Sequence, residues 1–308
     1  MKTIQDLKII FLGTPDFAVA SLDALIQAGM NVIAVVTAPD KPSGRGLQLQ
    51  SSAVKKHAES NSIRVLQPVK LKDPSFVDEL KSLHADLQVV VAFRMLPEIV
   101  WNMPPMGTIN VHASLLPQYR GAAPINWAVI NGEKDTGVTT FKLKHEIDTG
   151  DILLQAHVPI LPEDNAGTLH DKLMLEGAKL LVKTVEGLTD DTIREVPQSN
   201  ISATLQHAPK LFKEDMCINW NRPVNAIHQL IRGLSPSPAA FTVLKGKQLK
   251  VYQAHTEPGA TNADAGEFDT DHKTYLRFAA RDGWVYIDEL QLEGKKRMQV
   301  VEFLKGFR

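Results

Sequence analysis

Residues 108–124 read TINVHASLLPQYRGAAP, and this stretch decides the fold around it. It begins as an apolar strand and continues into a turn that contains Pro117, Gly121 and Pro124, so the strand should end near Ser114. In open α/β sheets the ligand crevice lies at the carboxyl ends of the strands. The stretch therefore predicts a site at the edge of such a sheet.

Two polar residues near the end of this strand, Asn110 and His112, are two positions apart and should share one face. They could also be a plain polar strand end, since this spacing alone specifies little. Residues 145–151, HEIDTGD, follow a second apolar run at 137–143. Asp148 in that turn could form an Asx-turn, or it could orient a histidine and stabilise its charged form.

On both sides of this stretch, segments with short continuous apolar runs alternate with segments whose apolar residues have helical spacing. This alternation predicts an α/β fold with a doubly wound, mostly parallel, Rossmann-like sheet. The expected strands are 7–12, 32–36, 63–66, 87–92, 108–112, 137–143 and 152–160, and the expected helices are 16–28, 54–59, 76–83, 123–130 and 168–188.

The last third of the chain has a different pattern. Residues 190–209 lose periodicity and are expected to be a linker between a domain of residues 1–189 and one of residues 210–308. A helix at 223–231 precedes short β-type runs with Gly and Pro between them, which suggest a small β-barrel. These runs are 241–244, 249–254, 275–279, 284–291 and 300–303.

Composition bounds the class of protein. The 308 residues are 44% hydrophobic and 22% charged, which is ordinary for a globular chain. There is no apolar run near the roughly 20 residues that a membrane helix needs, and residues 1–8 do not resemble a signal peptide. The single cysteine, Cys217, suits a reducing cytoplasm, which is the expected location.

Charge and motifs exclude several functions. Net charge is −1, although the residues from Leu205 onward hold 15 Lys and Arg against 12 Asp and Glu, which permits an RNA-facing C-terminal domain. The first strand-to-helix turn, residues 13–17, has one glycine where a dinucleotide site needs three. There is no P-loop and no H-E-x-x-H, so neither a nucleotide-hydrolysing site nor an essential metal is expected.

Residues 37–50 form a long segment in which Lys41 and Arg45 lie among Pro and Gly. It could be a mobile surface loop. It could instead reach an RNA partner, because Arg45 is flanked by two glycines and could approach phosphates or bases closely.

These segments together resemble the folate-dependent formyltransferases. That family carries an N-x-H strand end, an S-L-L-P turn followed by R-G-A-A-P, and a D-T-G-D loop, all present here within residues 110–124 and 148–151. Residues 9–17, IIFLGTPDF, and 39–47, PDKPSGRGL, narrow the match. The run AFRMLP at 92–97 departs from the small or glycine-containing run of many relatives, so the local shape of the pteridine pocket is open.

The resemblance implies transfer of a formyl group from 10-formyltetrahydrofolate to the amino group of methionyl initiator tRNA, for translation initiation. An amino-sugar nucleotide is an alternative acceptor, and a catalytically silent RNA-binding relative is an alternative of another class. The protein is expected to be a monomer without a metal, with residues 1–189 binding the formyl-folate and an open C-terminal barrel, residues 210–308, contacting the tRNA.

The resemblance also implies roles for individual residues. Asn110 and His112 would polarise the formyl oxygen, and Asp148 would assist His112 in moving protons. The turn that lines the folate pocket would be Ser114, Leu115, Leu116 and Pro117, with the two leucines packing on the folate ring system instead of the core. The tRNA would be contacted by Lys41, Arg45 and Leu47.

Overall fold

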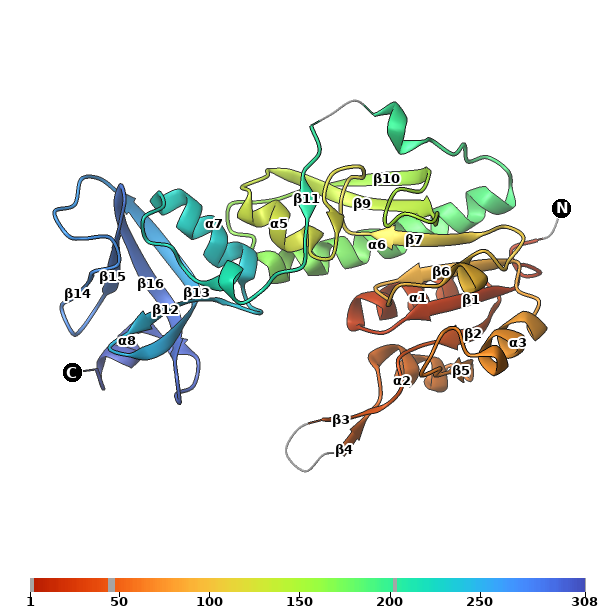
Figure 1. Ribbon diagram of the computed structural model, residues 1–308, viewed down its shortest axis with the longest axis horizontal. Coiled ribbons are helices and arrows are strands. Elements are labelled where there is room, and N and C mark those ends of the chain that lie inside the picture. The colour runs from red at the N-terminus through yellow and green to blue at the C-terminus, as the bar shows by residue number, and fades with distance from the viewer. Residues whose placement is uncertain (1–2, 44–47, 202–203, 308) are drawn as a thin grey trace. The chain divides into compact units, whose positions relative to one another are not determined.

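The structure is a computed structural model that describes residues 3–43, 48–201 and 204–307. It contains two compact units, drawn in Figure 1. The N-terminal unit comprises residues 1–120, 137–158 and 171–206, and the C-terminal unit comprises 121–136, 159–170 and 207–308. These units interleave along the chain, whereas the domains expected from the sequence are contiguous; where the domain boundaries lie stays a prediction.

A mixed seven-stranded sheet forms the centre of the N-terminal unit, with the order β10-β9-β7-β6-β1-β2-β5. The five neighbouring strands β7, β6, β1, β2 and β5 are parallel to one another, and β9 runs antiparallel to β7. The predicted mostly parallel α/β sheet is therefore confirmed. Its strands are β1 (Ile9–Gly13), β2 (Val32–Val36), β5 (Arg64–Leu66), β6 (Leu87–Val91), β7 (Thr108–His112), β9 (Asp135–Lys142) and β10 (Ile152–Pro159).

Two helices of this unit, α2 and α3, begin at residues whose side chains cap them. The Ser52 side chain accepts a hydrogen bond from the Lys55 amide at the start of α2, and Asp73 does the same for Ser75 at the start of α3. Apolar side chains of the sheet and of α3 and α4 then pack into one buried cluster. The helices are α1 (Asp16–Gln27), α2 (Ala53–Ser60), α3 (Pro74–Ser82), α4 (Glu98–Trp101) and α6 (Ala166–Thr189).

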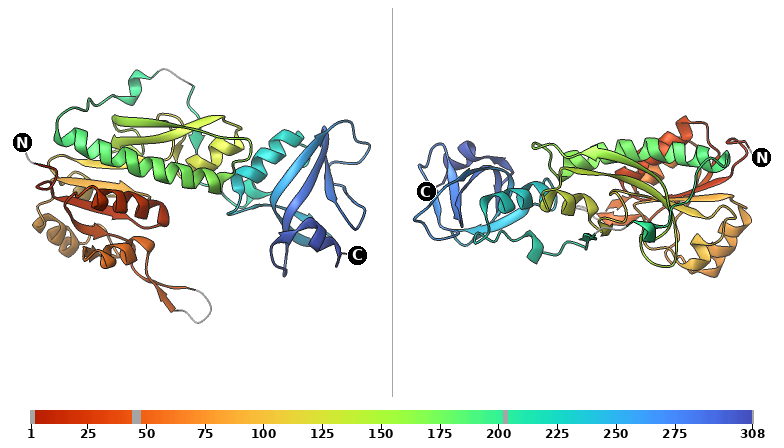
Figure 2. Two further views of the ribbon diagram at one scale, coloured as in Figure 1. Left: turned by 180° about the vertical axis from the view of Figure 1, so that it is seen from behind. Right: turned by 90° about the horizontal axis from the view of Figure 1, so that it is seen from above.

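Helix α6 covers one face of strands β7 and β9 (Figure 2). Its backbone comes close to the sheet at Gly177, where an added Cβ would lie 3.1 Å from Cγ1 of Val111 and 3.6 Å from Cγ1 of Val138. Side chains alternate along a strand, so the neighbours of Val111 on β7 point to the opposite face of the sheet. Asn110 and His112 therefore lie on the face that α6 leaves uncovered.

The C-terminal unit contains an antiparallel half-barrel sheet with the order β12-β13-β16-β15-β14, and β17 pairs with β16. The small β-barrel architecture expected from the sequence is confirmed. Its strands are β12 (Ala240–Leu244), β13 (Lys247–Pro258), β14 (Phe268–Thr270), β15 (Leu276–Ala280), β16 (Gly283–Leu292) and β17 (Met298–Gln299). The helices α5 (Pro124–Ile130), α7 (Val224–Leu234) and α8 (Val300–Leu304) also belong to this unit. The described residues also contain the strand pairs β3 (Lys41–Ser43) with β4 (Gln48–Gln50) and β8 (Arg120–Gly121) with β11 (His207–Ala208), and the 3-10 turns Gln198–Asn200 and Glu214–Met216.

Apolar packing holds this half-barrel together. Helix α7 buries a stripe of Val224, Ile227 and Ile231 against the sheet. The Trp220 ring stacks on Phe278 with centroids 4.6 Å apart, and its indole N–H donates to Thr242 Oγ1 at 3.0 Å. Burial of a large aromatic residue with its one donor satisfied is among the stronger single contributions to a core of this size.

One predicted strand, residues 300–303, is wrong, because the chain there forms helix α8. Its β-branched VV start indicates a strand. However, Val300, Phe303 and Leu304 have helical spacing, and all three are buried, while Val301 is 50% exposed. The preceding strand β17 already pairs with β16, and the chain then turns back to cover the core as a helix.

Candidate active site

The carboxyl end of β7 carries the polar pair predicted from the sequence. Strand β7 is bonded to β6 on one side and to β9 on the other, so it lies inside the sheet. His112 is only 8% exposed at its end. Within the described part of the chain, the half-buried Asn110 carboxamide makes no hydrogen bond to another residue. A half-buried amide without a protein partner is suited to a ligand, because such groups are otherwise satisfied within the fold.

The imidazole of His112 has partners on both sides. Its Nε2 lies 2.9 Å from the backbone oxygen of Tyr119. A carbonyl oxygen only accepts, so Nε2 carries the proton and donates it. Its Nδ1 lies 3.9 Å from Oδ2 of Asp148. The neutral ring thus keeps its lone pair on Nδ1, on the side of the carboxylate, and Nδ1 is the nitrogen that can take up and release a proton.

Asp148 comes to His112 on the loop that joins β9 to β10. Its side chain is 12% exposed, and its backbone adopts a left-handed φ of 55°. Gly150 permits this loop path, since a Cβ there would lie 1.6 Å from the backbone oxygen of Lys142. The structure thus brings together two residues that are 36 positions apart in the chain.

The turn after β7 is fixed by hydrogen bonds to the hairpin β9–β10. Thr139 Oγ1 donates to the Ser114 oxygen at 2.7 Å and accepts from the Leu116 amide at 3.1 Å. Gln155 Nε2 donates to the Leu116 oxygen at 2.9 Å. These hydrogen bonds hold the backbone of the turn in place, as a pre-formed ligand site requires. The role of the turn in folate binding stays a prediction.

Leu116 does not pack as the resemblance implied. Its side chain is 2% exposed and lies in a buried cluster with Phe141 and Ile152, so it belongs to the core and is not free to pack on a ligand ring. Leu115 is half-buried and packs against Gly137, where a Cβ would lie 2.6 Å from Leu115 Cδ2. The two consecutive leucines therefore have different surroundings, Leu116 in the core and Leu115 half-buried against Gly137.

The departure at residues 92–97 has a structural counterpart. Ala92 adopts a φ of 47°, in the left-handed region that residues other than glycine rarely adopt. Arg94 then donates to the backbone oxygen of Val69 at 2.9 Å and to that of Pro68. Partial burial lowers the pKa of Arg94. The guanidinium therefore fastens this segment to the loop after β5.

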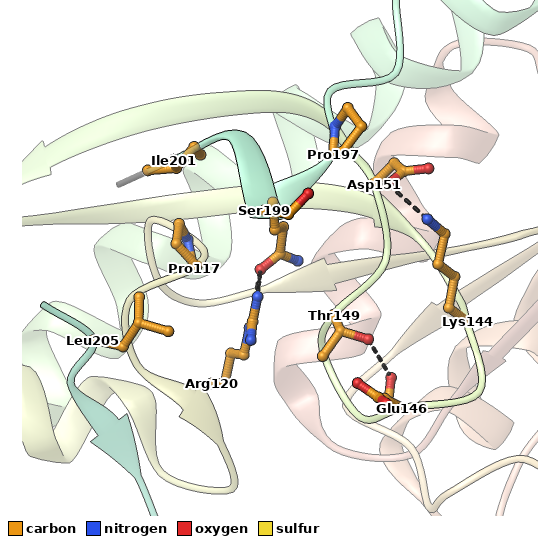
Figure 3. Close-up of a pocket in the computed structure, with 11 residues that line it drawn as sticks. Pro117, Arg120, Lys144, Glu146, Thr149, Asp151, Pro197, Ser199, Ile201 and Leu205 are labelled. Atoms are coloured by element: carbon orange, nitrogen blue, oxygen red, sulfur yellow. Dashed lines mark hydrogen bonds and ion pairs between the residues drawn. The ribbon is translucent and has the colours of Figure 1, made fainter. Parts of the chain in front are cut away.

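A cavity of about 370 Å³ lies beside the Asp148 loop (Figure 3). On one side of the cavity, Lys144 Nζ lies 2.7 Å from Asp151 Oδ1, and Thr149 Oγ1 donates to the backbone oxygen of Glu146 at 3.0 Å. Among the lining residues, the sequence predicted only Pro117 as functional, and it did not predict those from the expected linker. The lining consists of Pro117, Arg120, Lys144, Glu146, Thr149, Asp151, Pro197, Gln198, Ser199, Ile201 and Leu205.

The segment expected to contact tRNA begins as a hairpin, β3 (Lys41–Ser43) paired with β4 (Gln48–Gln50). Figures 1 and 2 draw it extending away from the sheet. Lys41 is exposed on β3. Arg45 and Leu47 lie outside the described residues. The contact with tRNA by all three residues stays a prediction.

The base of this hairpin is anchored to the N-terminal unit. Asp40 accepts hydrogen bonds from Lys55 Nζ at 2.6 Å and from Gln67 Nε2 at 2.8 Å. The hydrogen bond from Lys55, followed by that from Gln67, lowers the pKa of Asp40. An anchored base gives a projecting hairpin a defined direction, which a surface loop that reaches a partner requires.

Comparison with known proteins identifies the family. Residues 7–185 match the family described as formyl transferase, and residues 210–308 match the formyl transferase C-terminal domain. The chain belongs to the formyl transferase family. The resemblance drawn from its motifs is therefore confirmed. The two matched ranges leave residues 186–209 between them, close to the predicted linker.

Comparison with full-length relatives shows which members of this family the chain resembles in sequence. The chain is 56% identical over 313 residues to the methionyl-tRNA formyltransferase of Parabacteroides distasonis, covering 99% of this chain and 97% of that protein. It is 45% identical over 313 residues to the methionyl-tRNA formyltransferase of Porphyromonas gingivalis, covering 98% and 96%. Within the formyl transferase family, the chain thus groups with the methionyl-tRNA formyltransferases.

Solved structures share the fold at lower identity. An N-formyltransferase from Helicobacter canadensis, in complex with folinic acid and dTDP-3-aminofucose, matches with a TM-score of 0.68 and 20% identity over 95% of this chain and 100% of that chain. HypX from Aquifex aeolicus, in complex with tetrahydrofolic acid, matches with a TM-score of 0.66 and 18% identity over 97% of this chain and 47% of that chain.

Proposed function

We propose that this formyltransferase moves a formyl group from 10-formyltetrahydrofolate to the α-amino group of methionine on initiator tRNA. The observation that carries the proposal is the environment of His112. Its ring is buried, with Nε2 bonded to a carbonyl and Nδ1 facing Asp148, on the same strand face as the unengaged carboxamide of Asn110. Formyl transfer needs hydrogen-bond donors for the developing oxyanion and a group that moves a proton, and these side chains can provide both.

The reaction forms one bond and breaks another. The amine nitrogen attacks the formyl carbon, and the bond between that carbon and N10 of the folate breaks in a second step. Negative charge develops on the formyl oxygen, where the Asn110 amide and the protonated His112 ring would donate hydrogen bonds. Nδ1 of the neutral His112 ring first takes the proton that the attacking nitrogen loses, which gives the protonated ring, and Nδ1 then passes that proton to N10 as the bond from N10 to the formyl carbon breaks. No nucleophile of the protein is needed.

The formyl donor fits the residues that are present. Asn110 offers a carboxamide without a protein partner, and the rigid turn from Ser114 to Pro117 bounds the same strand end. The solved relatives that bind tetrahydrofolic acid and folinic acid share this fold. A folate-borne formyl group is thus the donor that these features support.

The acceptor follows from similarity and from the hairpin. Identities of 45–56% over nearly the full length are to methionyl-tRNA formyltransferases, whereas the sugar-modifying relative shares 20%. A projecting hairpin with Lys41 on β3 supports a large polyanionic acceptor over a compact sugar nucleotide. The presence of Asn110, His112 and Asp148 argues against a catalytically silent relative.

We also infer that the enzyme works in the cytoplasm as a monomer. A single cysteine, Cys217, fits a reducing compartment. In the described part of the chain, none of the helices combines the length and apolarity needed to cross a membrane. Size-exclusion chromatography with light scattering measures the oligomeric state, and a dimer mass would contradict the monomer.

The acceptor is tested by competition between substrates. The protein is incubated with 10-formyltetrahydrofolate and, in separate reactions, with methionyl initiator tRNA, methionyl elongator tRNA or a dTDP-amino sugar. We expect formyl-methionine on the initiator tRNA and little on the others. Formylation of the sugar nucleotide without formylation of tRNA would replace the proposed acceptor, and absence of transfer to any acceptor would support the silent alternative.

A further inference from the structure

Two residues beside His112 have strained backbones. Asp148 has a φ of 55° and Tyr119 a φ of 57°, both in the left-handed region that residues other than glycine rarely adopt. One supplies the carboxylate that faces Nδ1, and the other supplies the carbonyl that accepts from Nε2. Strain of this kind persists only where neighbouring groups hold the backbone in place.

Gln198 holds the Asp148 loop. Its Nε2 donates to the backbone oxygen of Asp148 at 2.9 Å and to that of Gly150 at 2.8 Å. Its Oε1 accepts hydrogen bonds from Arg120 Nε at 2.9 Å and from Arg120 Nη2 at 2.5 Å, and one of these contacts is the dashed line that starts at Arg120 in Figure 3. Arg120 fixes which end of the carboxamide carries the oxygen, and so it directs both N–H groups at the loop.

The hydrogen-bonding capacity of this carboxamide is fully used. Gln198 is 4% exposed, and both of its protons and both of its lone pairs have protein partners. Nothing remains with which it could bind a substrate. Although Gln198 borders the cavity beside the loop, its contacts are those of a positioning residue.

Gln118 holds the other partner of His112. The Tyr119 amide donates to the Gln206 oxygen at 2.7 Å. The Gln206 amide donates back to Gln118 Oε1 at 2.8 Å, and Gln118 Nε2 donates to the Thr204 oxygen at 2.9 Å. Residues 204–206 are thereby locked against the turn that presents the Tyr119 carbonyl.

We propose that Gln198 and Gln118 are positioning residues that brace His112 from its two sides, Gln198 through the Asp148 loop and Gln118 through Tyr119. This inference rests on the proposed function, because it assigns His112 and Asp148 to the chemistry. The stretch that looks like a linker in the sequence thus supplies half of the support for the active site. Outer partners of a functional histidine fix its orientation and tautomer in this way.

The brace makes a distinct kinetic prediction. Gln198→Leu keeps the size of the side chain and removes all four hydrogen bonds, so the loop is free to leave its strained backbone and the carboxylate no longer faces Nδ1. We expect turnover to fall by roughly 10- to 100-fold, by analogy with the loss of an outer partner of a metal-bound histidine. KM for methionyl-tRNA and for 10-formyltetrahydrofolate should stay within about twofold, because neither substrate touches the carboxamide.

A second variant separates the two halves of the contact. Gln198→Glu keeps the oxygen that Arg120 binds but places a carboxylate, which only accepts, against the Asp148 and Gly150 oxygens. It should lose at least as much turnover as Gln198→Leu. In the Asp148→Asn background, Gln198→Leu should cost nothing more, because the group that it positions is already gone. Gln118→Leu tests the other side and should lower turnover with KM unchanged.

The experiment measures kcat and both KM values for the wild type, for Gln198→Leu, Gln198→Glu, Gln118→Leu, Asp148→Asn and the double variant, and for a control. The control is Gln291→Leu, which removes a carboxamide that bridges Tyr252 and Lys295 on the C-terminal sheet and should leave kcat unchanged. Hydrogen exchange of residues 145–151 gives a readout that needs no activity. The loop should lose protection in Gln198→Leu while the melting temperature stays near that of the wild type.

The outcomes separate this inference from the proposed function. No transfer by the wild type, or full activity in Asp148→Asn, would count against the proposed function. Low activity in Asp148→Asn with wild-type turnover or unchanged loop protection in the Gln198 variants would overturn the brace alone. Multiplicative losses in the double variant would overturn it too. If Gln198→Leu fails to fold, the same criteria apply to Gln198→Glu, which keeps the Arg120 contact.

Discussion

Two pairs of a histidine and an aspartate, chosen from the described residues with one in each unit, differ in an instructive way. His255 Nδ1 lies 2.8 Å from Asp288 on the half-barrel sheet, where the two side chains are 63% and 32% exposed. His112 Nδ1 lies 3.9 Å from Asp148, with side chains that are 9% and 12% exposed. By distance alone, the C-terminal pair is the better contact, yet the N-terminal pair has the features of a site.

The difference lies in how each pair is built. His255 and Asp288 come from adjacent antiparallel strands, and His255 stacks on Tyr286 with centroids 4.8 Å apart, as ordinary cross-strand neighbours do. The N-terminal pair needs a buried strand end and a loop with a left-handed aspartate. Water screens the first pair, while the second acts in a less polar surrounding where a charge has a larger effect. Burial and backbone strain mark the site better than contact distance does.

The strongest test of this comparison exchanges one carboxylate for an amide in each pair. Asp148→Asn keeps the shape of the side chain and removes the charge that faces Nδ1, so turnover should fall by about 10³–10⁴-fold, as in a serine protease triad whose aspartate becomes asparagine. The pH–rate profile of the remaining activity should lose or shift one limb. Asp288→Asn is the matched control and should leave turnover within about twofold. Equal effects of the two changes would remove the distinction.

The next test truncates the groups that would meet the formyl oxygen. His112→Ala and Asn110→Ala should each lower turnover by on the order of a hundredfold or more, the cost of losing an oxyanion donor. Binding of the folate should change little. His255→Ala, in the exposed pair, should be close to wild type. Steady-state kinetics under saturating folate decide this, and near-normal turnover in either N-terminal variant would exclude that residue from the chemistry.

Local sequence chemistry explains why part of this site was predictable. The twofold period of a strand places Asn110 and His112 on one face, and the turn signal after Asp148 ends the loop. The alternation of apolar runs likewise predicts the parallel sheet. The contact between His112 and Asp148 was expected from the family resemblance only, because residues 36 positions apart meet through the fold and leave no local spacing.

Other parts had no signature that sequence reasoning could use. The carbonyl of Tyr119 is a backbone group, which every residue possesses. Gln198 lies in a stretch without periodicity, and its role depends on where the chain returns after α6. Leu116 and the residues of α8 differ from the expectation because tertiary packing decides which apolar side chain faces the core and overrides local preference.

A third test asks whether the positive charge of Arg45 serves tRNA recognition, as the proposed charge of Asp148 serves chemistry. If so, Arg45→Glu should raise KM for methionyl-tRNA by about tenfold at low salt and less at high salt, since one cationic contact with phosphate is replaced by repulsion. Arg45→Ala should have a smaller effect, and neither change should alter kcat or folate binding. Lys81→Glu, an exposed lysine at the end of α3, controls for net charge. Wild-type kinetics for Arg45→Glu across a salt series would exclude an RNA contact and favour the amino-sugar acceptor.

The smallest expected effect concerns the exposed charges of the C-terminal sheet. Asp269 accepts hydrogen bonds from Arg277 Nε at 2.8 Å and from the Tyr275 hydroxyl at 3.1 Å. The hydrogen bond from Arg277, with a further one from Tyr275, lowers the pKa of Asp269 below its ordinary 3.8. A carboxyl whose pKa is lower in the folded state stabilises the fold above its ordinary pKa, and this stabilisation is lost as the pH falls through the lowered value.

Asp269→Asn should therefore cost stability at neutral pH and cost less in acid. Because the Asp269 side chain is 41% exposed, solvent screening limits the loss at pH 7 to about 0.2–1 kcal/mol. Urea unfolding of the wild type and Asp269→Asn at pH 7 and near pH 3.5, followed by tryptophan fluorescence, measures the difference. Asp264→Asn, at an exposed position in the same unit, should show no difference at either pH. A loss well above 1 kcal/mol, or one that grows in acid, would mean that an exposed charge network can matter as much as a buried one, against the comparison of the two histidine–aspartate pairs.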